Sequence, residues 1–315
     1  MKSPFPFFKN ALVYKLSRDH HEAFQLLPLH DFMMPYRFNH CGEHDFAKTG
    51  WLFCDAPDND EQIPDILHRT GDIVLTLVQE KRQIPAGTIK REQEARFAKF
   101  EERVGRKPKK AERDSIKDEV FQSLIPRAFI KEFRTAIWID LTRSRVIVDA
   151  SSAKQAEDAL AFLRKTLGSL PVVPLTLEAP VEITLTSWLK NEEFPEGIAL
   201  SDKHQEAQFQ SILDLGGKVA YRKTDVISDV TNCLLEDGKL CTHLGVQVAE
   251  RVDLVLNADG AIKKLVYADE LVEQNNDIDS EDLQARRYAD FMLMTDELRN
   301  VIDVVIAGLG GEAQR

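Results

Sequence analysis

The chain has 315 residues, of which 43% are hydrophobic and 30% charged, a balance typical of a folded protein and not of a disordered or fibrous one. It contains no apolar run near the ~20 residues of a membrane span, and its first residues lack the apolar segment of a secretory signal. Because four cysteines do not make a disulfide framework in a chain of this length, we expect a cytoplasmic protein.

The net charge of −11 would argue against a nucleic-acid partner if the charge were evenly spread, and it is not. Residues 81–134 hold 16 Lys and Arg against 9 Asp and Glu, a net charge of +7, whereas the other 261 residues have a net charge of −18. Such a division predicts a basic surface on an acidic body. The acidic body would repel a polyanion and confine it to the basic surface.

The N-terminal part of the chain predicts two strands, at residues 9–16 and 73–78, because both segments are rich in apolar or β-branched side chains. Residues 28–70 lie between them, are rich in Pro, His and aromatic residues, and have little periodicity. We therefore expect this stretch to be mixed helix and loop.

Two amphipathic helices are predicted at residues 88–104 and 110–124, with a break around Gly105 and Pro108. The second helix carries an apolar stripe formed by Ile116, Val120 and Leu124. Two amphipathic helices make only a thin core. The stripe therefore needs a partner, either the body of the protein or a second copy that completes a four-helix bundle.

The rest of the chain alternates predicted strands and helices. Residues 136–140 and 145–149 predict a β-hairpin, followed by a helix that begins at a capping box, Ser152 to Gln155, and by a strand at 172–177. A less regular stretch at 180–214 comes next. The elements predicted after it are a strand at 218–223, a helix at 225–236, strands at 239–248, 251–257 and 261–267, and closing helices at 280–293, after Ser280, and at 296–307, after Thr295.

The turn of the basic helical hairpin allows two interpretations. Residues 105–110 carry four positive charges and no negative one, as a phosphate-contacting surface would. The two helices also supply acidic residues at spacings that pair with the cations, as a solvated helical face would. The acid-free turn favours phosphate contact, but the sequence leaves both interpretations open.

Metal ligands and catalytic residues have weak signals. His40, Cys41, His44 and Cys54 can be drawn together as a zinc site, but their spacing matches no common structural zinc pattern. The chain has no phosphate-binding loop, dinucleotide fingerprint or nucleophile elbow. We therefore expect no cofactor and no metal.

A nuclease remains an alternative, because Asp140 and Asp149 flank the 141–148 turn on paired strands and could hold Mg²⁺. Such a site generally needs a third acid and a lysine, which nothing in the sequence nominates. Asp residues at strand ends are usually turn formers.

Several segments have sequences that are more specific than their secondary structure alone would require. They are Cys41-Gly42…Ala47-Lys48-x-Gly50-Trp51; Asp114-Ser115-Ile-Lys-Asp-Glu-Val120; Leu124-Ile-Pro-Arg-Ala-Phe129; Ser152-Ala-Lys-x-Ala-Glu-Asp-Ala-Leu160; Leu163-Arg-Lys-Thr-Leu-Gly-Ser-Leu-Pro-Val-Val-Pro-Leu175; Ala268-Asp-Glu-Leu271; Gln274-Asn…Asp277-Ile-Asp279; Ala289-Asp-Phe-Met-Leu-Met-Thr295; and Leu309-Gly-Gly-Glu-Ala-Gln-Arg315. Together and in this order they resemble the RdgC family of recombination-associated proteins of Gram-negative bacteria, over nearly the whole chain.

The resemblance implies a nucleoid-associated, non-enzymatic protein that binds double-stranded DNA, and single-stranded DNA more weakly, with little sequence preference. It implies a ring-shaped homodimer with DNA through the central hole, which antagonises the recombinase RecA by occupying the DNA. The implied α+β fold has a central sheet domain with a packed helix (1–86 and 126–178), a protruding helical hairpin tip (87–125) and an α+β base domain (179–315).

The resemblance also carries expectations for particular residues. Phe129, in the segment that ends Pro-Arg-Ala-Phe, is expected at a contact between the two tips, and Arg127 is expected to face the hole. Arg222 and Lys223 stand where the family has a basic pair, although Thr224 replaces a glutamine found in a relative. The full expected DNA-contacting set is Arg82, Lys90, Arg106, Lys107, Lys109, Lys110, Arg127, Lys131, Arg134, Arg222 and Lys223. The expected dimer contacts are Ile116, Val120, Leu124 and Phe129.

One further function stays open beside the DNA clamp and the nuclease. The chain could be a protein-interaction module of recombination or replication that uses its acidic surface, with any DNA affinity incidental.

Overall fold

The computed structural model describes residues 5, 7–17, 29–55, 62–211, 217–279 and 282–313. The chain divides into two compact units: unit 1 comprises residues 1–27, 66–74 and 136–315, and unit 2 comprises residues 28–65 and 75–135. These boundaries differ from the three predicted parts, which stay a prediction. In the described residues no helix is long and apolar enough to cross a membrane.

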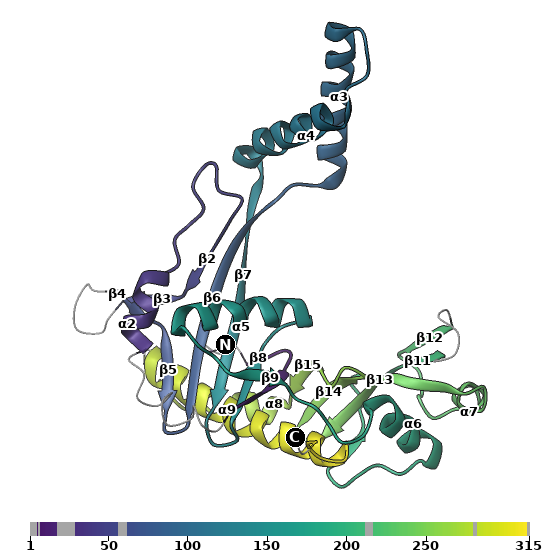
Figure 1. Ribbon diagram of the computed structural model, residues 1–315. Helices are drawn as coiled ribbons and strands as arrows, with labels where there is room; N and C mark the ends of the chain where they lie inside the picture. The colour runs from purple at the N-terminus through teal and green to yellow at the C-terminus, as the bar shows by residue number, and fades with distance from the viewer. Residues whose placement is uncertain are drawn as a thin grey trace. The chain divides into compact units, whose positions relative to one another are not determined.

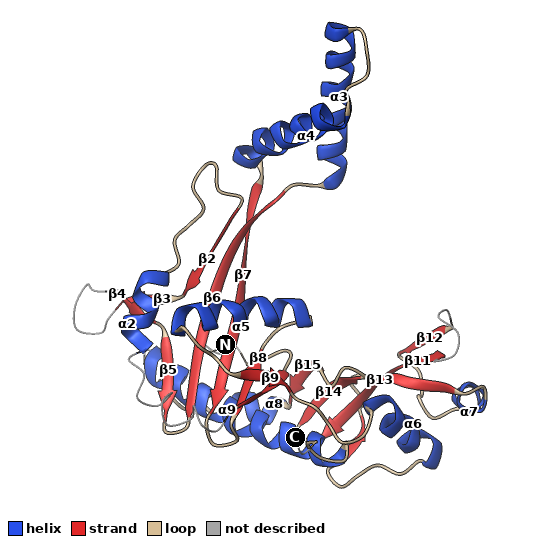
Figure 2. Ribbon diagram, in the orientation of Figure 1, coloured by secondary structure: helices blue, strands red, loops and turns tan. Residues whose placement is uncertain are grey.

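The architecture is α+β, with two antiparallel sheets and eight α-helices in the described part of the chain (Figure 2). The first sheet has the strand order β2-β6-β7-β8-β1-β9, with β5 paired to β6 (Figure 1). Its strands are β1 (Leu12–Leu16), β2 (Ala47–Trp51), β5 (Ile66–Arg69), β6 (Asp72–Gln83), β7 (Phe129–Asp140), β8 (Arg145–Val148) and β9 (Val172–Pro174).

The second sheet lies in unit 1 and has the order β12-β11-β13-β14-β15, with β10 paired to β13. Its strands are β10 (Ile198–Leu200), β11 (Glu206–Ser211), β12 (Lys218–Arg222), β13 (Lys239–Val248), β14 (Val252–Asn257) and β15 (Ile262–Tyr267).

The helices and the remaining strands complete the two units. Unit 2 contains α2 (Leu29–Met33), η2 (Met34–Tyr36), α3 (Ala86–Val104), α4 (Lys110–Leu124), η3 (Ile125–Arg127) and a two-stranded sheet of β3 (Phe53–Asp55) and β4 (Gln62–Pro64). Unit 1 contains α5 (Ala153–Leu167), α6 (Val181–Asn191), α7 (Asp229–Glu236), α8 (Asp269–Glu273) and α9 (Leu283–Gly308).

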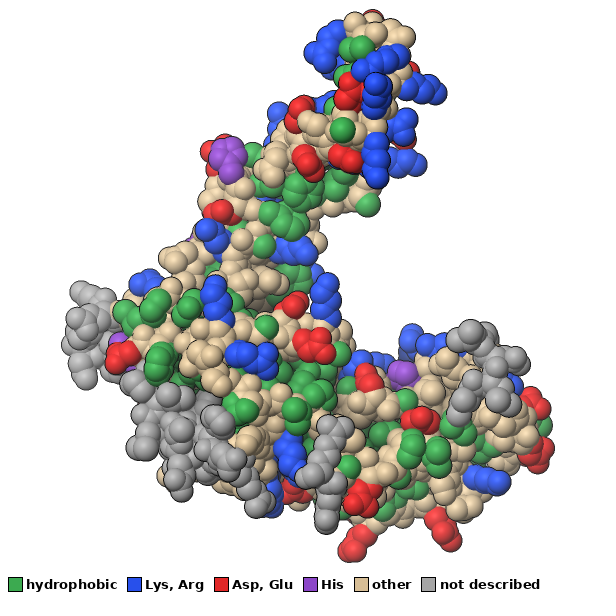
Figure 3. All heavy atoms as spheres, viewed as in Figure 1, with side chains coloured by type: hydrophobic (Ala, Val, Ile, Leu, Met, Phe, Trp, Pro, Cys, Tyr) green, Lys and Arg blue, Asp and Glu red, His purple; other side chains and the backbone are tan. Residues whose placement is uncertain are grey.

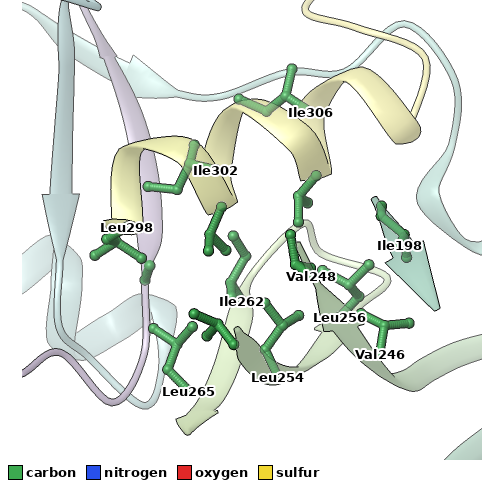
Figure 4. Close-up of a cluster of buried hydrophobic side chains, with 14 of the residues drawn as sticks. Ile198, Val246, Val248, Leu254, Leu256, Ile262, Leu265, Leu298, Ile302 and Ile306 are labelled. Carbon is green, nitrogen blue, oxygen red and sulfur yellow. The ribbon is translucent and has the colours of Figure 1, made fainter. Parts of the chain in front are cut away.

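The core of unit 1 forms around α9, the helix drawn in yellow in Figure 1. Its buried apolar residues, among them Leu298 and Ile302, belong to one cluster with Val248, Leu254 and Leu256 of the second sheet (Figure 4). The same cluster includes Trp138 and Ile147 of the first sheet. A single helix therefore closes the core against both sheets, and burial of apolar surface is the main favourable term that holds them there.

A buried charge cluster fixes α9 to the first sheet. Arg299 donates from Nε to Asp140 Oδ2 at 2.9 Å and from Nη2 to Asp72 Oδ1, and both carboxylates are almost fully buried. The indole N–H of Trp138 donates to Asp72 at 3.0 Å, and Arg69 Nε does so at 2.6 Å. The strand ends and the helix are thus joined by charge-assisted hydrogen bonds, which are stronger than neutral ones.

Several sequence predictions are confirmed. The two helices of the hairpin form as α3 and α4, and the predicted β-hairpin pairs Ile137 with Val148 and Asp140 with Arg145. The Ser152 hydroxyl accepts the Gln155 N–H at 3.3 Å, as the capping box predicts. The second sheet was also anticipated from residue 218 to residue 267.

Other predictions were wrong. The two closing helices are one helix, α9, because Thr295 does not cap a new helix but donates its hydroxyl hydrogen to the Phe291 carbonyl one turn back, at 2.9 Å. Ser280 lies outside the described residues. Residues 28–70 contain helix and loop, as predicted, but their described part also holds four strands of three to five residues, too short to produce a periodic pattern. The stretch 180–214 contains α6, whose apolar spacing was overlooked, and two strands.

Replacement of Arg299 by Ala should lower the free energy of unfolding by about 3–5 kcal/mol, because it leaves the buried Asp140 carboxylate without its cation and Asp72 with Arg69 alone. Chemical denaturation measures the change. The matched control is Arg143→Ala: Arg143 is 51% exposed, pairs with Asp303, and should contribute about 1 kcal/mol or less. Equal losses in the two variants would contradict the importance of the buried cluster.

Candidate nucleic-acid interface

The basic part of the sequence folds as the α3–α4 hairpin of unit 2. The Gly105 backbone at φ 74° ends α3, a left-handed conformation that glycine adopts without strain. No residue of α3 is buried, and Val120 is the one buried residue of α4. As the sequence predicts, the hairpin has almost no core of its own within one chain.

An acidic side chain from outside the turn of the hairpin lies against the turn in the folded chain. Glu112, from the first turn of α4, accepts both guanidinium nitrogens of Arg106, at 2.7 and 2.8 Å, and the Lys109 N–H at 2.7 Å. These bonds lower the pKa of Glu112 from 4.5 to about 2, Arg106 being the main cause. The acid-free turn inferred from the sequence is therefore corrected, because an i+6 carboxylate folds back over it.

The other expected DNA-contacting residues of unit 2 are mostly exposed (Figure 3). Two of them have an acidic neighbour: Lys90 lies 3.9 Å from Glu94, and Arg134 lies 2.7 Å from Glu132. Surface pairs of this kind contribute little energy, so they give way readily to another anion. The exposed set is Lys90, Arg106, Lys107, Lys109, Lys110, Arg127, Lys131 and Arg134.

Arg82 is a correction to the expected set. Its side chain is buried, with the residue only 7% exposed, and its guanidinium donates to the backbone carbonyls of Asp45, Ala128 and Gly42 at 2.9–3.0 Å. These bonds satisfy three carbonyls where the chain segments around β6 meet. Arg82 is thus a structural residue of unit 2, and we remove it from the DNA-contacting set.

The expected dimer contacts differ sharply in exposure. Val120 is 0% exposed in a single chain, so it packs inside unit 2 and is corrected from an intersubunit contact to a core residue. Ile116 and Leu124 are half-buried. Phe129, at the start of β7, is 87% exposed, and the adjacent Ile130 is 43% exposed. Because the two residues are consecutive in a strand, their side chains project from opposite faces of β7, and one chain leaves both of them uncovered.

The basic pair of the second sheet lies in unit 1. Arg222 ends β12 and is exposed, with Nε 4.0 Å from Glu206 Oε2. Lys223 follows it with φ 58°, and its N–H donates to the Gln205 carbonyl at 2.7 Å. Both side chains are available to a ligand from solvent.

The two aspartates of the nuclease hypothesis do not face each other. Asp140 pairs across the hairpin with Arg145, and its carboxylate accepts the Thr142 N–H and Arg299 Nε. Asp149 stands at the other end of β8 and accepts the Asn10 N–H at 2.9 Å. Turn formation and ion pairing account for the Asp140 carboxylate, and hydrogen bonds from Asn10 account for that of Asp149.

The zinc hypothesis also lacks an assembled site in the described residues. His40 Nδ1 lies 2.6 Å from Glu80 Oε1, and the Cys41 N–H donates to the other oxygen of Glu80 at 2.7 Å. Over the described ranges, no group of three or more His, Cys, Asp or Glu side chains is placed to hold a metal ion. The expected absence of metal and cofactor stays a prediction.

Sequence reasoning overlooked two features of these surfaces. The bond between Glu112 and the Lys109 N–H was detectable, because an acid three residues after a helix N-cap commonly folds back onto it. The polar side chains on one face of the second sheet, among them His243, have a weaker signal: the alternation of apolar and polar residues at 243–248.

The exposed cationic hairpin and the two-sheet α+β fold define a class of protein suited to a polyanionic partner. The family model described as "Putative exonuclease, RdgC" matches residues 6–312. Recombination-associated protein RdgC of Yersinia enterocolitica is 46% identical over 307 residues, which cover 98% of this chain and 99% of the relative. The proteins of the same name from Serratia proteamaculans and Enterobacter sp. are each 45% identical, with the same coverage.

The chain therefore belongs to the RdgC family, as its sequence motifs indicate. The names of the curated relatives place them in recombination, whereas the description of the family model refers to an exonuclease.

The Glu112 carboxyl group should titrate far below the usual range of glutamate. Because its pKa is lowered in the folded chain, the cap that it forms is complete above pH 4.5 and is lost as the pH falls toward about 2. NMR of the side-chain carboxyl carbon measures the midpoint. Arg106→Gln should move it back toward 4.5, whereas Lys107→Gln should leave it in place; an ordinary midpoint in the parent would refute the pairing.

Proposed function

We propose that the protein binds double-stranded DNA with little sequence preference and, as a ring-shaped homodimer, limits RecA-mediated recombination. The observation that carries the proposal is the set of exposed lysines and arginines on and next to the α3–α4 hairpin, in a chain with a net charge of −11. Membership of a family whose curated members are named recombination-associated supports it.

The chemistry of the hairpin favours contact with the DNA backbone. Lysine and arginine neutralise phosphates without reading bases, whereas base recognition requires side chains presented in a groove with fixed geometry. Single-stranded DNA, with its lower charge density, is expected to bind more weakly. The acidic remainder of the chain would keep DNA on the basic surface.

The exposure of Phe129 and Ile130 supports a homodimer that pairs hairpin ends. A phenylalanine that is largely exposed in one chain is an apolar surface of the kind that another chain covers. Ile116 and Leu124, half-buried on α4, would extend the contact. A second contact elsewhere would close the ring, and the enclosed DNA would be withheld from RecA. We propose a location at the nucleoid for the same reason.

Duplex affinity should depend steeply on salt. If the protein makes about 6–10 phosphate contacts, affinity should fall ~10³–10⁵-fold between 50 and 200 mM salt. The reason is that the entropy gained by releasing counterions from DNA decreases as the salt concentration rises. Exchange of Arg106, Lys107, Lys109 and Lys110 for Glu should weaken binding to all duplexes alike and flatten this dependence. Fluorescence anisotropy with several unrelated duplexes measures both effects.

A smaller pair of variants provides the control. Lys107→Glu with Lys110→Glu should weaken binding strongly, whereas the charge-matched Lys154→Glu with Lys190→Glu, at exposed positions of unit 1, should not. Equal effects would favour a general charge effect and the protein-interaction alternative. Incubation with Mg²⁺ belongs in the same series, because cleavage of the duplex would support the exonuclease description and contradict our proposal.

Phe129→Ala should reduce retention on closed circular DNA while barely changing the melting temperature of the protein. Phe129 is 87% exposed in one chain, so its removal costs little folding energy. At a contact between subunits, a buried aromatic carries a large share of the binding energy, and its loss would open the ring.

The two measurements distinguish the alternatives for Phe129. Leu283→Ala, at an exposed apolar position of unit 1, is the control and should affect neither quantity. A large fall in melting temperature with unchanged retention would place Phe129 in the core of one subunit and contradict the proposed contact.

A further inference from the structure

The second sheet has one apolar and one polar face. Its apolar face packs against α9 (Figure 4), whereas the opposite face holds a cavity of about 250 Å³. Gln208, His243 and Asn257 form a row across this face, because the register pairs His243 with Gln208 on one side and with Asn257 on the other. All three line the cavity.

Asn257 points to a ligand. The residue is only 5% exposed, its Oδ1 atom is fully buried, and that atom has no hydrogen-bond partner among the residues that the structure describes. Buried side-chain polar atoms in proteins nearly always have a partner. An amide can turn over, which would bring its N–H₂ group to the same place as a donor. An anion in the cavity would give this amide the partner that it lacks.

The charges around the row are predominantly positive. Arg222 and Lys264 line the cavity on either side of Glu206, whose carboxylate lies 2.5 Å from Lys264 Nζ and 4.0 Å from Arg222 Nε. Lys263, which pairs with Val255 in β14, lines it as well and has no acidic partner within salt-bridge distance in the described part of the chain. Glu206 thus neutralises one of three cations and leaves an excess of positive charge.

The pKa of His243 is also affected by the positive charges near the cavity. Burial is the main cause that lowers its pKa below 6.5, and Lys218 and Lys263 lower it further. The acidic groups Asp259 and Glu206 oppose the shift without cancelling it. A neutral imidazole in cationic surroundings will gain a proton when an anion binds beside it.

We propose that this cavity, bounded by Gln208, Arg222, His243, Asn257 and Lys263, binds one phosphodiester group of the DNA backbone. The proposal rests on the proposed DNA-binding function and assigns it a specific anion site in unit 1. Lys263 and Arg222 supply charge, and Asn257 and His243 supply hydrogen-bond donors. The volume is below the range of cavities that hold whole small molecules, which favours a phosphate group over a complete nucleotide ligand.

Binding should then depend on pH through His243. A bound phosphate raises the histidine pKa above its value in the free protein, so affinity is greatest at low pH and falls as the pH rises through the pKa of the bound state. His243→Gln should remove this part of the pH dependence.

The experiment compares duplex affinity in three single variants across a range of salt. Asn257→Asp places a carboxylate of the same shape in the cavity, and Lys263→Gln removes one cation. Each should weaken binding about tenfold, and Lys263→Gln should lower the salt slope by about one. Lys154→Gln, a charge-matched change at an exposed position of α5, should have no more than a twofold effect. If Asn257→Asp fails to fold, Lys263→Gln alone decides.

The outcomes separate this proposal from the proposed function. If the parent binds duplex DNA and both cavity variants bind as tightly as Lys154→Gln, the cavity proposal is overturned and the function stands. If the parent binds no duplex, the function fails. NMR of the His243 imidazole with added inorganic phosphate then tests the cavity itself: a saturable shift, absent in Asn257→Asp, supports an anion site, and an unshifted signal overturns it.

Discussion

The ion pairs of Arg299 with Asp72 and Asp140 are the contact on which the arrangement of unit 1 depends. They fix α9 to the ends of β6 and β7, and the apolar stripe of the same helix covers one face of the second sheet. Arg299 is partly buried and its two carboxylate partners are almost fully buried, so displacement of the arginine would leave buried negative charge without a cation or solvent. The polar face of the second sheet is left to solvent as a consequence.

The positive charge of this protein is concentrated in one segment, and individual ion pairs neutralise some of the cations in it. The hairpin carries the excess of cations, but Glu112 binds Arg106 and Glu132 binds Arg134. Such pairs hold long side chains in place at small energetic cost and release them to a stronger anion. The cationic surface available to an anionic ligand is therefore defined less by the count of cations than by which of them lack a committed partner.

Two pairs of neighbouring residues illustrate the limit of pattern reasoning at the candidate site. Arg82 and Lys90 have the same formal charge, but Arg82 is enclosed by three carbonyls and Lys90 is exposed. Val120 and Phe129 are both apolar and close in sequence, but one is fully buried and the other almost fully exposed. Formal charge and hydrophobicity are the same for a core residue and a contact residue, so only the packing around each side chain separates them.

The sequence by itself determined the α+β class, the basic hairpin of α3 and α4, the capped helix after Ser152, the strands from residue 218 onward and, through its motifs, the family. These features are local: periodicity, caps and turn residues act over a few positions. Only the tertiary structure decided that the last two predicted helices are one, that Asp140 serves an ion pair, and that His243, Asn257 and Lys263 line one cavity. Those outcomes depend on pairing between segments distant in the chain, for which a single sequence carries no local signal.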